Sequence, residues 1–413
     1  MNKEQQILPE LRFPEFVNDG AWKIKRLSKL GTIINGLTYS PKDVQEDGLL
    51  VLRSSNVQDG QIVLNDCVFV RPDIKGANIS SPNDILICVR NGSKSLIGKN
   101  AILTEGLPKS THGAFMTMFR SNNPTFAFQL FQTESYQTQV KADLGATINS
   151  INTKNFIKYE FAVPSNLKEQ QKIANCLSSL DEVIKTESEK LNLLQDHKKG
   201  LLQQLFPQQG KTQPQFRFPE FKNDGDWTLT TLNDVADYEN GKAHEKEISK
   251  NGKYKVVNSK FISTEGEVVK FSDSANLETK IGDILMVLSD IPNGKALAKC
   301  FCVDKDDTYT VNQRICKITT TDINNVFLFY QLNRNKYFLR FDDGAKQTNL
   351  RKDDVLSCPI LKPKNPKEQD KIANTLTSAS ILIEEQKLKI ENLQNHKKGL
   401  LQQLFPNVNN VAV

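Results

Sequence analysis

A long internal repeat constrains this chain more than any other feature of its sequence. The pentapeptide RFPEF at residues 12–16 recurs at residues 217–221, an offset of 205 residues. Trp22 and Trp227, the two tryptophans of the chain, lie at the same offset. Several motifs matching at one fixed offset predict two copies of one structural module.

The far ends of the two copies also match. The run HKKGLLQQLFP at residues 197–207 returns unchanged at residues 396–406, and the offset is now 199. Since the offset falls from 205 to 199, the divergent middle of the second copy is six residues shorter. A period of about 200 residues is far longer than that of a solenoid, so it indicates a two-part module present twice.

The end of each copy predicts a long helix. Asn166 can cap the first helix, and Glu169 is placed to complete a capping box; Asn365 and Glu368 repeat this arrangement in the second. Pro366 falls at the first helical position, which favours proline. The prolines that end the two HKKGLLQQLFP runs stop both helices. Each helix is therefore just short of 40 residues, or about 58 Å at 1.5 Å per residue.

Apolar residues recur along both helices in alternating steps of four and three. In the first helix they are Ile173, Leu177, Leu180, Ile184, Leu191, Leu194, Leu201 and Leu205. In the second they are Ile372, Leu376, Ala379, Ile383, Ile390, Leu393, Leu400 and Leu404. The series are interrupted by Glu187, Lys198, Gln386 and Lys397. A sustained period of 3.5 residues is typical of a coiled-coil seam.

Such a seam needs a partner, and the two helices can supply it to each other. We predict an antiparallel pair within the chain, related by a pseudo-two-fold axis that places two globular blocks at opposite ends. The alternatives are that each helix packs on its own block or on another protein. The predicted parts are a first block at 1–164, a spacer helix at 165–207, a second block at 208–363, and a second helix with a tail at 364–413.

The blocks have the sequence texture of a mixed α/β fold. Strands are predicted for the β-branched runs at 49–52, 85–89 and 284–288. One buried helix per block is predicted for the runs rich in Phe and Leu at 126–132 and 327–331. The dipeptides Asn35-Gly36 and Asn240-Gly241, equivalent in the repeat, predict turns.

Several functional classes are disfavoured by what the sequence lacks. The seven cysteines are scattered, and the close pair Cys300 and Cys302 has no second pair to complete a zinc site. Residues 92–100 resemble a P-loop but have five residues between the glycines, and Asn100 stands where Ser or Thr should bind magnesium. No NPPY-type motif of adenine methyltransferases is present. We therefore expect a non-catalytic chain with no metal and no cofactor of its own.

The sequence also argues against a membrane protein. No apolar run approaches the roughly 20 residues of a membrane helix. Residues 1–9 are polar and lack the apolar core of a signal peptide. A cytoplasmic protein is predicted. The net charge of +6 is mild and does not by itself indicate nucleic acid.

Taken together, the motifs resemble those of the specificity subunits of type I restriction-modification enzymes. The resemblance rests on an LRFPEF-type start followed by a tryptophan, two variable blocks, and a KEQxKIA helix that ends in HKKGLLQQLFP. It covers essentially the whole chain. It implies two target-recognition domains that each read one half of a split, asymmetric DNA site, and two helices that fix the gap between the half-sites. The divergent middles suggest that the two half-sites differ.

The resemblance also implies partners. The helices of such subunits dock two methyltransferase subunits, which bind S-adenosylmethionine and methylate adenine, and restriction subunits join them to cleave DNA with ATP and Mg. Double-stranded DNA and both kinds of subunit are thus the expected partners, and the cofactors are expected on the partner subunits. The alternative is a non-catalytic scaffold whose two paralogous blocks bind proteins instead of DNA.

Candidate DNA contacts lie in polar loops, because base edges are read mainly by Arg, Lys, Asn and Gln. In the first block they are Arg53, Asn56, Arg90, Asn91, Ser93, Lys94, Lys99, Asn149 and Asn152. In the second they are Asn258, Ser259, Lys260, Lys295, Asn312, Gln313, Arg314, Gln347, Asn349 and Arg351. Residues 109–112 form a further polar cluster, in which His112 is expected to be an ordinary surface histidine. Each cluster could equally be a solvated loop.

The repeated helix ends carry a second set of candidates, which are His197, Lys198, Lys199, His396, Lys397 and Lys398. Cations are favourable near a helix C-terminus, and this alone accounts for the charge. Their recurrence in an unchanged run predicts an additional role, the docking of a partner protein.

Overall fold

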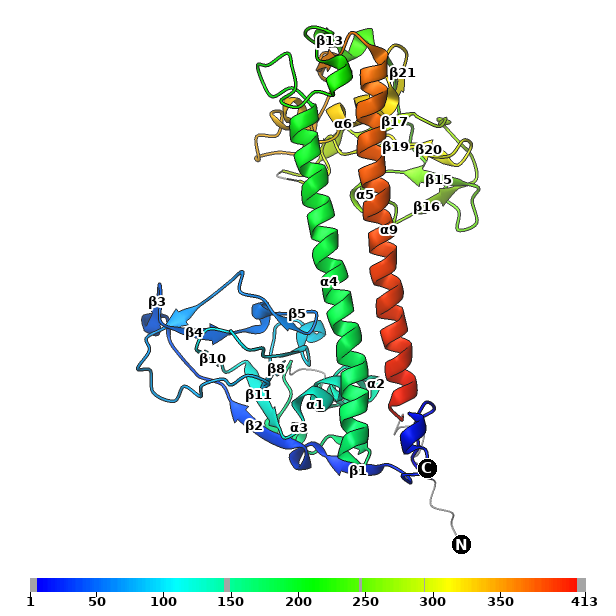
Figure 1. Ribbon diagram of the computed structural model, residues 1–413. Coiled ribbons are helices and arrows are strands. Elements are labelled where there is room, and N and C mark those ends of the chain that lie inside the picture. Colours follow the sequence, from blue (N-terminus) through cyan, green and yellow to red (C-terminus); the bar gives the residue numbers. More distant parts are fainter. Residues whose placement is uncertain (1–5, 145–148, 245–246, 293, 407–413) are drawn as a thin grey trace. The chain divides into compact units, whose positions relative to one another are not determined.

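The computed structural model describes residues 6–144, 149–244, 247–292 and 294–406. The chain divides into two compact units, whose elements are labelled in Figure 1. Unit 1 contains the described residues up to Ser188 and those from Leu388 onward, and unit 2 is Glu189–Lys387. The two longest helices, α4 (Leu167–Leu205) and α9 (Pro366–Leu404), therefore contribute one part to each unit.

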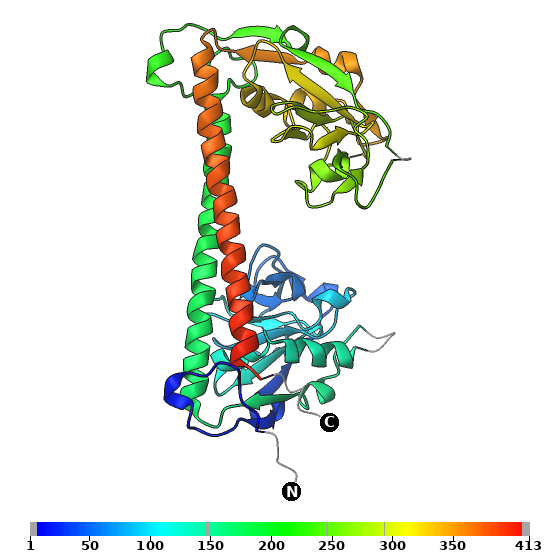
Figure 2. The ribbon, with the colours of Figure 1, turned by 90° about the vertical axis from the view of Figure 1, so that its right-hand side faces the viewer.

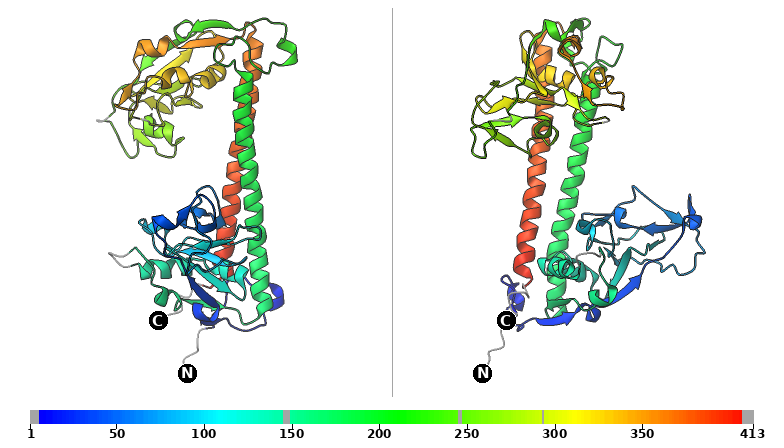
Figure 3. Two further views of the ribbon diagram at one scale, coloured as in Figure 1. Left: turned by 90° about the vertical axis from the view of Figure 1, so that its left-hand side faces the viewer. Right: turned by 180° about the vertical axis from the view of Figure 1, so that it is seen from behind.

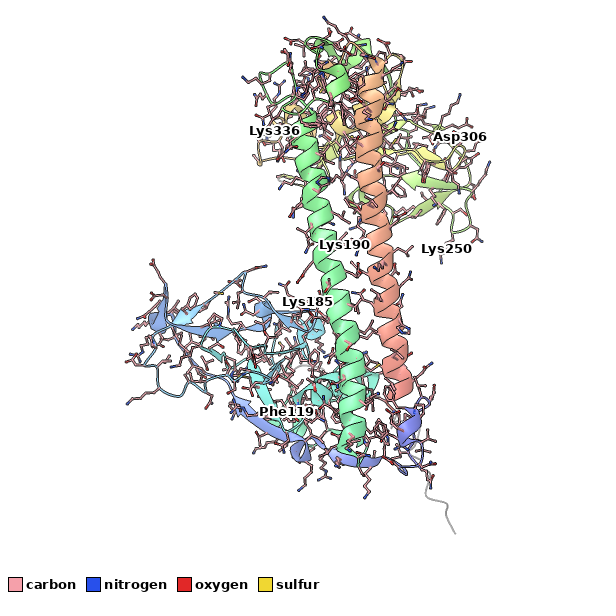
Figure 4. The ribbon with its side chains drawn as sticks, viewed as in Figure 1. Phe119, Lys185, Lys190, Lys250, Asp306 and Lys336 are labelled. Atoms are coloured by element: carbon pink, nitrogen blue, oxygen red, sulfur yellow. The ribbon has the colours of Figure 1, made fainter. Side chains whose placement is uncertain are left out.

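Two four-stranded sheets form the centre of unit 1. One is antiparallel, in the order β2-β11-β8-β9, and the other, β10-β4-β7-β3, contains the parallel pair β10 and β4. The strands are β1 Lys23–Arg26, β2 Gly31–Asn35, β3 Val44–Gln45, β4 Leu49–Leu52, β5 Val57–Gln58, β6 Gln61–Ile62, β7 Phe69–Val70, β8 Ile85–Cys88, β9 Asn100–Ile102, β10 Ser110–His112, β11 Met116–Ser121 and β12 Glu160–Val163. The shorter helices are α1 Pro124–Leu130, α2 Glu134–Asp143 and α3 Thr153–Phe156. Phe119 of β11 is fully buried inside this block (Figure 4).

Unit 2 repeats this plan. Its antiparallel sheet has the order β14-β21-β17-β19, and β15 pairs with β20 in parallel. The strands are β13 Thr228–Thr231, β14 Ala236–Asn240, β15 Tyr254–Val257, β16 Lys270–Ser272, β17 Ile284–Val287, β18 Ser289–Asp290, β19 Cys300–Cys302, β20 Tyr309–Val311, β21 Ile315–Thr320, β22 Thr348–Asn349 and β23 Pro359–Lys362. The shorter helices are α5 Ser259–Ser263, α6 Asn325–Leu332, α7 Lys336–Leu339 and α8 Lys352–Leu356. Figure 2 shows β13 and β23 side by side.

The predicted repeat and most predicted elements of the blocks are confirmed. The predicted strand at 49–52 is β4, and those at 85–89 and 284–288 each end one residue earlier, as β8 and β17. The predicted helix at 126–132 overlaps α1, which begins and ends two residues earlier, and the one at 327–331 lies within α6. The blocks also contain the short helices α2, α3, α5, α7 and α8, which the sequence did not predict. They are too short or too polar to give a clear apolar period.

The two Asn-Gly dipeptides were expected to form turns, and this prediction is wrong. Asn35 ends strand β2, and the chain continues in extended form through Gly36 to Leu37, which bridges to Gly113. A Cβ atom at Gly36 would lie 2.2 Å from the Gly113 carbonyl oxygen. A Cβ atom at Gly241 would likewise lie 2.1 Å from the Asn312 carbonyl oxygen. Glycine is thus required by a close approach of two backbones.

The pattern of burial along α4 and α9 confirms the predicted seam. Every apolar position of both predicted series is buried or half-buried. The most deeply buried are at the ends, Ile173, Leu177 and Leu205 on α4 and Ile372, Leu376 and Leu404 on α9, all at most 2% exposed. Leu193, which lies off the seam, is 70% exposed. None of the described helices has the length and apolar character to cross a membrane.

Within each unit the two helical segments lie side by side and run antiparallel (Figure 3). In unit 1, Lys397 pairs with Asp181 and Lys389 with Glu187, so rising residue numbers on α4 meet falling numbers on α9. In unit 2, the end of α4 at Leu205 shares a cluster with Ile372 near the start of α9. The intramolecular pair is therefore confirmed. The alternative also holds in part, because the ends of the helices pack on the globular blocks as well.

A buried ion pair joins each globular block to the start of its helix. Arg12 donates two hydrogen bonds to the Glu169 carboxylate, both of 2.8 Å, and the Trp22 indole donates a third of 3.2 Å. In unit 2, Arg217 and Trp227 contact Glu368 in the same way. The predicted capping boxes are therefore wrong in one respect. Asn166 and Asn365 cap the helices as expected, but the glutamates bind arginine and tryptophan instead of completing the box.

The repeated helix ends fill the space beside these ion pairs, and each fills the unit of the other copy. In unit 1, Leu404 and Phe405 of the second copy pack against Trp22, Phe126 and Leu177 of the first. In unit 2, Leu205 and Phe206 of the first copy pack on Trp227, Phe327 and Leu376 of the second. We call each helix end the plug, and the tryptophan, ion pair and helix start that receive it the socket. Identical plugs are needed because the two sockets are alike.

The Arg217–Glu368 pair gives a prediction of stability. The Arg217 and Glu368 side chains are 7% and 0% exposed, so Glu368→Ala leaves a buried, unpaired guanidinium and should destabilise unit 2 by about 3–5 kcal/mol. Urea unfolding followed by Trp227 fluorescence, in a Trp22→Phe background, measures this effect. The matched control in the same unit is Glu220→Ala, which removes an exposed pair with Lys371 and should change stability by less than about 1 kcal/mol. Equal effects of the two substitutions would contradict a special contribution of the buried Arg217–Glu368 pair to stability.

His112 is buried in unit 1, and the expectation of a surface histidine is wrong. It ends strand β10, where Nε2 donates a 3.0 Å hydrogen bond to the Ile34 carbonyl and Nδ1 is enclosed without a partner among the described residues. Burial lowers the pKa of His112 to about 4. The imidazole is therefore neutral in the folded protein at pH 7.

This histidine should make unit 1 sensitive to acid. The unfolded chain binds a proton on His112 near pH 6.5 and the folded chain only near pH 4, so stability is lost as the pH falls between these values. Between pH 7 and pH 5 the loss should be about 2 kcal/mol. The measurement is urea unfolding at both pH values, followed by Trp22 fluorescence in a Trp227→Phe background. His112→Gln, whose amide can still donate to Ile34, should lack this component; an unchanged pH dependence would refute the idea.

Candidate nucleic-acid interface

In unit 1 the predicted polar clusters converge at one place, where four segments meet. The Gly113 amide donates to the Leu52 carbonyl at the end of β4, at 3.1 Å. The Val89 and Arg90 amides, after β8, both donate to the Phe115 carbonyl at 3.0 Å. The Asn91 amide donates to the Asn149 carbonyl at 3.3 Å. One backbone frame is thus formed by four segments: the residues after β4, the residues after β8, the turn between β10 and β11, and residues 149–151.

Unit 2 contains the same frame at equivalent positions. The Asn312 amide donates to the Val257 carbonyl at 3.1 Å, as Gly113 does to Leu52. The Leu288 amide donates to the Arg314 carbonyl at 2.9 Å, as Val89 does to Phe115. Strand β18 pairs with β22 where Arg90 bridges to Ser150 in unit 1. The backbone geometry is therefore shared by the two units.

The side chains on this frame differ at almost every position. Arg90 is replaced by Ser289, Asn91 by Asp290, Phe115 by Arg314, Asn149 by Thr348 and Ser150 by Asn349. One backbone that presents two different sets of donors and acceptors is suited to reading two different base sequences.

Most of the predicted contact residues are available at the surface. The exposed ones are Arg90, Ser93, Lys94, Lys99, Asn152, Lys260, Lys295, Gln313, Arg314, Gln347, Asn349 and Arg351. The half-buried ones are Arg53, Asn91, Asn149, Asn258, Ser259 and Asn312. Asn293, two residues before the predicted contact Lys295, lies outside the described residues.

Some predicted residues have structural roles instead. Asn56 is completely buried and its amide donates to the Val63 and Asp66 carbonyls, so the prediction of a direct DNA contact by Asn56 is wrong. Asn152 caps α3 and Asn258 caps α5 through their side-chain oxygens, which occupies one acceptor of each. Both asparagines are polar loop residues, and sequence alone does not separate a helix cap from a DNA contact.

Phe115 is a surface residue that the sequence did not reveal. It is 58% exposed on the turn between β10 and β11, and the Arg90 guanidinium lies 5.4 Å from its ring centroid. Phe115 immediately precedes the strand β11, whose first residues are buried, so its sequence context predicts another core residue. Equivalence with Arg314 in the repeat is the signal that could have identified it.

The structure separates the predicted docking residues into two groups. His197, Lys199, His396 and Lys398 are exposed. Lys198 instead lies over the Tyr330 ring at 5.4 Å, where burial lowers its pKa, and Lys397 pairs with Asp181 with 15% of its side chain exposed. Both inward lysines interrupt the seam series. Lys198 and Lys397 therefore pack within the protein, and we no longer assign them to partner docking.

The cavity found in unit 2 does not belong to this frame. Its volume is about 820 Å³, and its lining includes Asp237, Glu239, Glu278, Asp283 and Asp307 but only two lysines. An acidic lining repels phosphate, so it does not favour contact with DNA. Among the described residues, no cluster of three or more His, Cys, Asp or Glu side chains could hold a metal ion.

Comparison with known proteins agrees with this architecture. The family model described as the type I restriction modification DNA specificity domain matches residues 20–196 and 224–393, one match in each copy of the repeat. The specificity subunit of the type I restriction enzyme StySPI from Salmonella potsdam is 32% identical over 169 residues, covering 38% of this chain and 36% of that protein. The chain thus spans about a third of that relative's length.

Two further relatives match over greater lengths. The specificity subunit of the type I restriction enzyme MjaVIII from Methanocaldococcus jannaschii is 28% identical over 355 residues, 79% of each chain. The crystal structure of a type I restriction-modification S subunit from M. genitalium superimposes with a TM-score of 0.62 at 17% identity, covering 97% of this chain and 100% of that one. The last comparison shows a common fold. Since the family model covers well over half of its residues, the chain belongs to the type I restriction modification DNA specificity domain family.

Proposed function

We propose that this chain is the DNA specificity subunit of a type I restriction-modification complex and reads a split site, one half with each unit. The observation that carries the proposal is the shared backbone frame with divergent side chains. Unit 1 offers Arg90, Asn91 and Asn149, whereas unit 2 offers Gln313, Arg314 and Asn349. Arginine favours guanine, and asparagine or glutamine favours adenine. Because these side chains stand at different positions of the frame in the two units, the two half-sites should differ.

The helical pair would set the gap between the half-sites. Both α4 and α9 belong in part to unit 1 and in part to unit 2, so each unit is tied to the other by two continuous helices. Two readers joined in this way select sites by spacing as well as by sequence, and the second half-site binds at high effective concentration.

The repeated surface at the helix ends supports docking of two copies of one partner protein. His197, Lys199 and Gln204 are exposed in unit 2, and His396, Lys398 and Gln403 are exposed at the equivalent positions of unit 1. Each glutamine lies seven positions, about two helical turns, after its histidine, so the two side chains lie on one face of the helix. The buried plug does not require these side chains. We assign the surfaces to two methyltransferase subunits.

In this proposal the chain itself is non-catalytic and binds no cofactor. The methyltransferase subunits would hold S-adenosylmethionine, and restriction subunits would use ATP and Mg to cleave double-stranded DNA. The assembly would act on DNA in the cytoplasm.

An exchange of one block tests the reading function. The variant carries the second globular block, residues 208–363, from a family member of different specificity, and is produced with its methyltransferase subunits in a host that lacks adenine methylation. Each unit has its own core and frame, so half of the methylated sequence should change and the other half should remain. Long-read mapping of methylated adenines measures both halves. A site that stays the same in both halves would reject the proposal.

A paired insertion tests the spacer. One heptad is added after Ser188 of α4 and one after Lys387 of α9, at the boundary of the units, so that both seams keep their register. Seven residues add about 10 Å, the length of about three base pairs, and the gap in the methylated site should lengthen while both half-sites remain. An insertion in α4 alone is the control and should abolish methylation, because it shifts one seam against the other. An unaltered gap in the paired variant counts against the spacer.

A further inference from the structure

Phe115 is an exposed aromatic ring in a polar setting. It is 58% exposed, and the segments that meet it carry Arg90, Asn91 and Asn149. Burying an aromatic side chain is strongly favourable, so a ring left in water needs a reason. A single ring among polar side chains is too small for a protein-docking patch.

The backbone holds this ring in a fixed position. The Phe115 carbonyl accepts hydrogen bonds from two successive amides, Val89 and Arg90, each of 3.0 Å. The next residue, Met116, begins a strand whose first four residues are buried. Phe115 is thus anchored on both sides by the frame, while its side chain projects from the surface.

Arg90 lies over this ring. Its guanidinium lies 5.4 Å from the ring centroid, a cation–π contact. A contact of this kind restrains a long side chain, and the N–H groups of the planar guanidinium can still donate to an acceptor. The pair therefore offers an apolar face next to a planar double donor.

Unit 2 has a different device at the same place. Arg314 occupies the position of Phe115 and Ser289 that of Arg90, so the pair of an arginine and an aromatic ring is confined to unit 1 among the described frames. The backbone under both positions is the same, since the Leu288 amide donates to the Arg314 carbonyl. The aromatic ring is therefore not needed to build the frame.

We propose that Phe115 and Arg90 together read a guanine with a neighbouring thymine in the half-site of unit 1. Arg90 donates to guanine O6 and N7, and the Phe115 ring packs on the thymine C5 methyl group. This inference rests on the proposed function and adds to it a specificity-determining residue and the bases it selects.

The test removes the ring and the methyl group separately and together. The complex with its methyltransferase subunits binds duplexes that carry the mapped site, with each thymine of the first half-site replaced in turn by deoxyuridine. For the unaltered chain, one replacement next to a guanine should weaken binding by about fourfold to tenfold. Phe115→Ala should bind the thymine duplex more weakly by a similar factor and be insensitive to that replacement.

Two controls make the result specific. Arg314→Ala should alter discrimination in the second half-site and leave the deoxyuridine effect in the first unchanged. Arg90→Lys keeps the charge but loses the planar double donor, so it should relax selection of the guanine. Circular dichroism of each variant checks that the fold is retained.

Three outcomes would overturn the inference: a first half-site without a guanine beside a thymine, an equal deoxyuridine effect in Phe115→Ala and the unaltered chain, or a loss of affinity in Phe115→Ala that is the same for every sequence. The last outcome would identify the ring as a wedge between bases. If Arg314→Ala and the block exchange still alter the second half-site, this inference alone fails; if neither does, the proposed function fails.

Discussion

The buried contact of arginine, tryptophan and glutamate is the interaction on which the rest of the molecule depends. In each unit it joins the first residues of a globular block to the first turn of a long helix, and the helix end from the other copy closes over it. A paired charge in an apolar setting is costly to disturb and specific in geometry. It therefore fixes where each helix leaves its block, and with it the direction of the seam.

This contact also gives a physical meaning to the repeated motifs. RFPEF supplies the arginine of the socket and, through Glu15 and Glu220, an ion pair to Lys172 and Lys371. KEQxKIA supplies the glutamate and the lysine, and LLQQLFP supplies the plug. Most of the recurring motif residues build the joint, whereas the divergent middles carry the frame of candidate contacts.

The sequence predicted the helices, their seam and the repeat because these depend on periodic burial along one element. It placed the candidate contact clusters in loops that follow buried strands, since polar residues after buried strands are a local signal. It could not separate the buried Asn56 from the exposed Arg90, because burial depends on contacts that form only when the chain folds. For the same reason Phe115 was missed and His112 was placed at the surface. Tertiary packing decides all three.

The exchange of plugs has a consequence for synthesis of the chain. Unit 1 cannot complete its core until residues 388–405 have left the ribosome, so Trp22 and Phe126 must wait for the far end of the polypeptide. During that wait the identical plug at the end of α4 is already present. It is carried on a helix of 39 residues, about 58 Å long, whose own start forms the waiting socket. A rigid helix cannot fold back on its own beginning, so its stiffness protects the nascent chain from closing on itself.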